Sequence, residues 1–161
     1  MESFTVLVNS AEALSNNNAA APNTSLNYYF DWSILPDQPY QVHFTFLGEI
    51  NDLSAGNDLA MLYLDFGCGT NNFAVKSGSY GANTSNFLGF LRPERLVASS
   101  FLYAEDSTNT PIFIKGRPRN NNFTVDILNN ASSPTYFVPA TGNLAPYAIQ
   151  LRFIPYKEET D

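Results

Sequence analysis

The chain has 161 residues, a formal net charge of -7 and an aromatic fraction of 14%, a combination that fits one domain with a full hydrophobic core and excludes a disordered chain. Because binding to nucleic acids draws on lysine and arginine side chains, the acidic balance also argues against a nucleic-acid partner. The single cysteine, Cys68, excludes an internal disulfide.

The N-terminal segment contains a candidate strand at residues 4–9. It lacks the cationic region and apolar run of a signal peptide, so we expect a protein that is not secreted. No stretch approaches the roughly 20 apolar residues that a membrane-spanning helix needs, and we expect no membrane partner. Residues 10–25 include an asparagine run at 16–18 and Pro22, and they are predicted to form a flexible loop.

Residues 26–34 are predicted to form a strand with an unusual concentration of aromatic side chains. Alternation would place Tyr28 and Trp32 on one face and Tyr29 on the other. We expect the first face to be core. The alternative is an exposed aromatic patch that serves a protein interface or a sugar ring.

The clearest strand pattern covers residues 40–50, where Val42 and Phe44 fall on the apolar face and His43 falls on the polar face. His43 is the only histidine, so a His-rich metal cage is excluded, and a nucleophile–base pair would need His43 as its base. Its position on the polar face of a strand predicts an ordinary surface side chain.

Further candidate strands follow, each bounded by polar turns. They cover residues 59–66, 87–91, 96–103, 112–115, 123–127 and 147–153, with a turn or short helical start at 92–95. The turns leave no room for crossover helices, which predicts antiparallel pairing. We therefore predict an all-β antiparallel β-sandwich, specifically a jelly roll, of eight to nine strands, in one domain over residues 1–161 with a tail at 157–161.

No arrangement of reactive residues emerges from the sequence. The loop at residues 51–58 resembles a calcium loop but lacks alternating oxygen ligands and a closing glutamate. Cys68 lies between two glycines in a turn and is expected to serve packing, with an exposed thiol as the alternative. We expect no enzymatic activity, no metal and no cofactor.

Interface residues are predicted from the aromatic and basic segments. The basic residues at 115–119 are predicted to form a solvated turn, because a phosphate-binding surface normally spreads over a whole face. The candidate contact residues are Tyr28, Tyr29, Trp32, Tyr40, Arg117 and Arg119.

The Asn-, Thr- and Ser-rich composition, the strand layout and the segments LPDQPY at 35–40 and GRPRN at 116–120 resemble small jelly-roll minor capsid or penton-type proteins of large icosahedral DNA viruses. The resemblance implies a non-enzymatic subunit that contacts itself or other capsid-type subunits as an oligomer. It also implies a location in the virion after assembly in the host-cell cytoplasm, and no cofactor. The alternative is a carbohydrate-binding β-sandwich module that stacks sugars on exposed tyrosine or tryptophan.

Overall fold

The computed structural model describes residues 2–17, 24–50, 60–72, 87–97, 100–129 and 144–157. These residues form ten strands and two short 3-10 helices. The strands are β1 (Phe4–Asn9), β2 (Ser15–Asn16), β3 (Ser25–Tyr29), β4 (Tyr40–Ile50), β5 (Ala60–Leu64), β6 (Phe87–Val97), β7 (Ser100–Glu105), β8 (Ile112–Ile114), β9 (Asn122–Asn129) and β10 (Leu144–Pro155), and the helices are η1 (Ser10–Glu12) and η2 (Trp32–Ile34).

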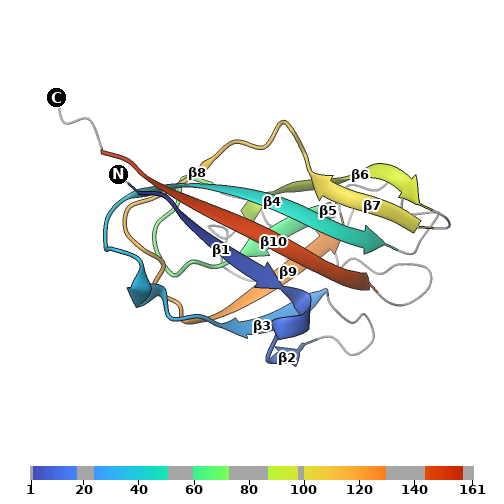
Figure 1. Cartoon of the computed structure of the whole chain (residues 1–161), viewed down its shortest axis with the longest axis horizontal. Helices are drawn as coiled ribbons and strands as arrows, with labels where there is room; N and C mark the ends of the chain where they lie inside the picture. The colour runs from blue at the N-terminus through green and yellow to red at the C-terminus, as the bar shows by residue number, and fades with distance from the viewer. Residues whose placement is uncertain are drawn as a thin grey trace, which may run out of the picture.

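All named strands belong to one hydrogen-bonded sheet in the order β1-β10-β4-β7-β6-β5-β9-β3-β2, and β8 pairs with β4 as well. Every strand pair is antiparallel. The sheet curls so that β1, β10 and β4 lie in front of β9 and β5 (Figure 1). The prediction of an all-β antiparallel sandwich is confirmed, with β2 as a strand that was not predicted.

The long strand β4 connects the two ends of its layer. Its first residues pair with β8 and its last residues pair with β7, while β10 follows almost the whole of its other edge. Along β4, Val42 and Phe46 are buried and His43 is exposed. The predicted alternation is therefore confirmed at these positions, because one face of the strand covers the core.

Aromatic side chains hold the two layers together. The Trp32 ring lies 5.6 Å from the ring of Phe153 in β10 and 5.6 Å from the ring of Phe123 in β9. The hydroxyl oxygens of Tyr28 and Tyr147 are 3.3 Å apart in the same interior. Burial raises the pKa of both tyrosines, so the pair is held in its neutral form.

The predicted strand at residues 26–34 was wrong in its second half. β3 ends at Tyr29, and Trp32 begins the helix η2. The Asp31 carboxylate accepts hydrogen bonds from the backbone amide of Ser33 at 3.0 Å and from its hydroxyl at 2.6 Å. An aspartate that caps the next turn in this way competes with strand pairing, which explains why the chain bends here.

Two other boundaries also differ from the prediction. The expected turn at 92–95 lies inside β6, where the register with β7 shifts between Pro93 and Arg95. Such an irregularity lets a proline occupy a strand. The predicted strand at 96–103 is divided between β6 and β7, which form adjacent antiparallel strands.

The predicted loop at 10–25 contains regular structure in its described part. Ser10 begins η1, and β2 pairs with β3. The asparagine at 18 and Pro22 lie outside the described residues, as do the loop at 51–58 that resembled a calcium loop and residues 158–161 of the predicted tail. Among the described residues, the structure contains no helix with the length and hydropathy of a membrane span.

Candidate functional site

Three of the predicted interface residues lie in the core and are unavailable for contact in this fold. Tyr28 and Tyr40 are buried, and only 1% of Trp32 is exposed. The Trp32 indole N–H donates to the Asn120 carbonyl at 2.9 Å, and the Tyr40 hydroxyl donates to the Pro36 carbonyl at 2.6 Å. Burial of a large aromatic side chain stabilises a fold most when its polar N–H or O–H group also forms a hydrogen bond. These residues therefore serve the structure of the core. The burial of Trp32 also removes the main support for sugar stacking.

The other three predicted residues reach the surface at two places, Tyr29 at one and the two arginines at the other. Tyr29 is 58% exposed at the end of β3. Arg117 is half-buried, and its guanidinium donates to the Leu35 carbonyl at 3.2 Å. Arg119 is exposed and forms an ion pair with Asp37 at 3.6 Å. The basic segment is therefore a loop fixed to the segment before β4, as its interpretation as a turn predicts.

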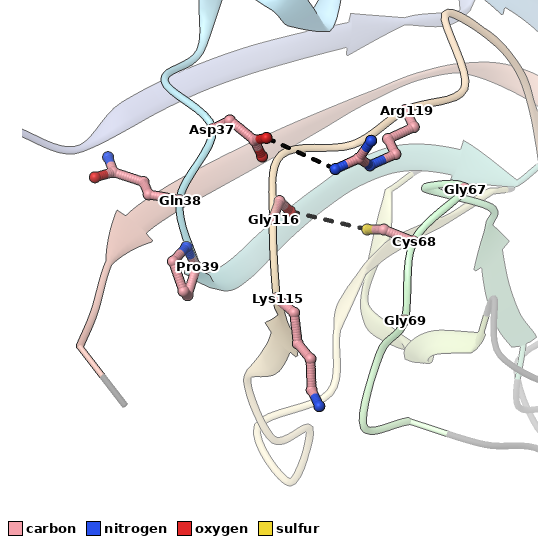
Figure 2. Close-up of a pocket in the computed structure, with 9 residues that line it drawn as sticks. All are labelled: Asp37, Gln38, Pro39, Gly67, Cys68, Gly69, Lys115, Gly116 and Arg119. Carbon is pink, nitrogen blue, oxygen red and sulfur yellow. Dashed lines mark hydrogen bonds and ion pairs between the residues drawn. The ribbon is translucent and has the colours of Figure 1, made fainter. Parts of the chain in front are cut away.

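A cavity of about 410 Å³ lies between three loops around this ion pair. Its lining comes from residues 37–39 and 67–69 and from Lys115, Gly116 and Arg119. Figure 2 shows Asp37 and Arg119 directed toward one another across the cavity, while the Lys115 side chain extends away from them. The Asp37 carboxylate also accepts a hydrogen bond from the Arg117 backbone amide at 3.2 Å. Because these charges already satisfy one another, they stabilise the loops more than they offer a binding site.

Cys68 faces the same cavity, and its Sγ lies 3.9 Å from the Gly116 carbonyl (Figure 2). Burial raises the pKa of this thiol to about 11, although the nearby Arg119 guanidinium acts in the opposite direction. We expect iodoacetamide to label Cys68 very slowly at pH 7, where only about one thiol in ten thousand is ionised. The labelling rate should rise about tenfold per pH unit up to pH 10. A rate at pH 7 like that of a free cysteine peptide would contradict this expectation.

His43 lies exposed on β4 with Arg152 of β10 as its direct cross-strand neighbour. Within the described part of the chain, no three His, Cys, Asp or Glu side chains gather into a group that could hold a metal ion.

A second hollow, of about 420 Å³, lies on the outer face of β1, β10, β4 and β7. We call it the outer-face groove. It is lined by Leu7, Thr45, Phe46, Leu47, Ala104, Glu105, Ala148 and Gln150. Leu7 is 65% exposed and Leu47 is 58% exposed. Both leucines stand on the solvent side of strands whose other face covers the core.

The shape of the outer-face groove follows from the strand register. Ala148 of β10 lies directly opposite Leu47 of β4, which in turn lies opposite Ala104 of β7. Leu7 of β1 lies opposite Gln150. Because the alanines are short and the leucines are long, the apolar surface is hollowed between the leucines.

Charge is scarce in the outer-face groove. Of the lining residues in the described part of the chain, only Glu105 is ionisable. Its carboxylate accepts a hydrogen bond from the backbone amide of Phe46 at 2.9 Å. An exposed apolar surface with few charges is typical of a contact region between proteins. The sequence analysis missed this groove, although leucines at outward positions of β1 and β4 were a readable signal.

No family model matches this chain, and no curated protein or solved structure shows significant similarity to it.

Proposed function

We propose that this chain is a non-enzymatic structural protein that assembles with neighbouring subunits through its outer-face groove. In its most specific form, the proposal is a capsid component of a large icosahedral DNA virus, located in the virion and assembled in the host-cell cytoplasm. The observation that carries the proposal is the pair of exposed leucines, Leu7 and Leu47, on a face of a rigid antiparallel sheet.

The energetics of contact support this proposal. Covering an exposed leucine contributes about 1.5–3 kcal/mol if the side chain becomes fully buried. Leu7 and Leu47 supply this apolar area, and Thr45 and Gln150 border it with polar groups, joined by a hydrogen bond of 3.3 Å. A central apolar region with a polar border is the usual arrangement of a protein interface.

The test is whether the native protein is part of a larger assembly. We expect it to co-sediment with a purified particle at a fixed stoichiometry. Leu47→Asp should lower its incorporation at least about tenfold, because a carboxylate would be buried without a partner. Leu14→Asp is the matched control, since Leu14 is 67% exposed and is not among the lining residues of the groove. Absence of the native protein from any purified particle, with a strict monomer at high concentration, would refute the proposal.

A further inference from the structure

β1 is the outermost strand at its end of the sheet. It pairs with β10 on one side, and Figure 1 shows it as the last strand of its layer. Among the residues that the structure describes, no strand pairs with its other edge. An open edge of this kind is a template for pairing with another strand.

The register identifies which backbone groups face the open edge. The Phe46 amide donates to Glu105, on the β7 side of β4 and away from β10. In an antiparallel pair of strands, two opposite residues either exchange both backbone hydrogen bonds or both direct their N–H and C=O groups away from each other. Ile149, which lies opposite Phe46, therefore directs its backbone groups toward Val8 of β1. The Tyr147 amide, which donates to Ser10 at 3.0 Å, points to the same side.

Because this direction alternates along a strand, Val6 and Val8 bond to β10, whereas Thr5 and Leu7 direct their N–H and C=O groups to the open edge. Asn9 directs only its N–H there, because its C=O accepts the first hydrogen bond of η1, which Asn9 caps. The same three residues carry the outward side chains, since Val6 and Val8 are buried. The open edge thus combines the outward peptide groups of Thr5 and Leu7 and the Asn9 N–H with the exposed Leu7 side chain.

The edge also lacks the features that prevent strand pairing. Residues 4–9 contain neither proline nor a charged side chain, which are the usual protections of an exposed edge. The nearest carboxylates in sequence, Glu2 and Glu12, lie outside the strand. In a chain with a formal net charge of -7, two copies repel each other least where their contact surfaces are neutral.

We propose that the open edge of β1 pairs with the β1 edge of a second copy of this chain, antiparallel across a two-fold axis that passes through Leu7. In this register, Leu7 faces Leu7 of the second copy, Thr5 faces Asn9, and Val6 faces Val8. The N–H and C=O groups of Leu7 pair with those of Leu7 in the second copy, and the two leucine side chains contact each other directly. Isologous contacts of this kind are the commonest form of homodimer. The inference rests on the proposed function and names its first partner.

Substitutions at Leu7 test the pairing in the purified chain. Leu7→Pro removes an outward amide and leaves the β10 pairing in place, since edge strands tolerate proline where the N–H faces solvent. Leu7→Glu places two carboxylates opposite each other across the axis. Each variant should raise the dimer dissociation constant roughly tenfold or more in sedimentation equilibrium. Ile34→Glu is the matched control, because Ile34 is also 65% exposed but lies in η2, and it should leave the constant unchanged.

Amide hydrogen exchange tests the same pairing without a variant. In dilute protein, the amides of Thr5, Leu7 and Asn9 should exchange quickly while those of Val6 and Val8 are protected by β10. Raising the protein concentration should protect the three outward amides selectively. Added salt should strengthen the association, because it screens the repulsion between two acidic chains.

Several results would overturn the β1 pairing. One is that the chain stays monomeric at millimolar concentration. Another is that a dimer forms but Leu7→Pro and Leu7→Glu leave it intact. A third is that the exchange rates of the outward amides do not depend on protein concentration. If the native protein is nevertheless found in a particle from which Leu47→Asp is excluded, the proposed function stands and only the β1 pairing is wrong. Absence of the native protein from every particle refutes the proposed function in either case.

Discussion

Replacing Trp32 with alanine is expected to lower the free energy of unfolding by about 3–5 kcal/mol, the usual loss for a large buried aromatic residue. Trp32 is 1% exposed and contacts rings from both layers of the sandwich. Its removal also leaves the Asn120 carbonyl without the indole donor. The loss should appear as a lower urea midpoint, followed by far-ultraviolet circular dichroism.

Ile34→Ala is the matched control for Trp32→Ala, because both residues lie in η2 but Ile34 is 65% exposed. We expect this change to alter the free energy of unfolding by less than about 0.5 kcal/mol. Similar losses for both variants would mean that Trp32 does not join the two layers.

Gly67→Ala should destabilise the protein by about 2 kcal/mol. Gly67 has a φ of +69°, and an added Cβ would lie 2.5 Å from two side-chain atoms of Asn120 and 2.9 Å from its backbone nitrogen. The left-handed backbone disfavours alanine, and the contact would push apart two loops that are joined by the hydrogen bond from the Arg119 amide to the Phe66 carbonyl at 2.8 Å. Thermal unfolding at several urea concentrations would measure the loss.

Gly69→Ala gives the comparison for Gly67→Ala within the same loop. Apart from its chain neighbours, no atom of the described residues lies within 4 Å of an added Cβ at Gly69, and its φ is outside the left-handed region. Alanine should therefore be neutral or stabilise the protein by about 0.5 kcal/mol, because it restricts the unfolded chain. A loss as large as that of Gly67→Ala would contradict the assignment of strain to position 67.

The strands that sequence predicted best are those with one face on the core. β1 and β4 begin and end at the predicted residues. A half-buried strand alternates apolar and polar residues, and this period can be recognised in the sequence. Trp32 shows the limit of that signal. Its spacing from Tyr28 is compatible with one strand face, yet its burial comes from a turn that Asp31 caps. The continuity of the sheet depends on pairing between distant segments, which local periodicity does not encode.

The contact residues were harder to predict than the fold. Tyr28 was expected on the core face and was also named, with Tyr40, as a candidate contact residue, because large rings serve a core as well as an interface. The structure buries both. Leu7 and Leu47, the contact residues that we propose, were overlooked because the groove around them depends on which strands pair and which alanines lie beside the leucines. Both facts follow from tertiary pairing rather than from composition.

The pairing of β1 with β10 has a mechanical consequence. Phe4, at the start of β1, lies opposite Phe153, near the end of β10, so β1 begins and β10 ends on the same side of the sandwich (Figure 1). Tension applied between these two ends would load one hydrogen-bonded pair at a time, as a zipper opens, instead of shearing all pairs together. The protein should therefore yield at low force when it is pulled by its termini, with β1 the first strand to peel away.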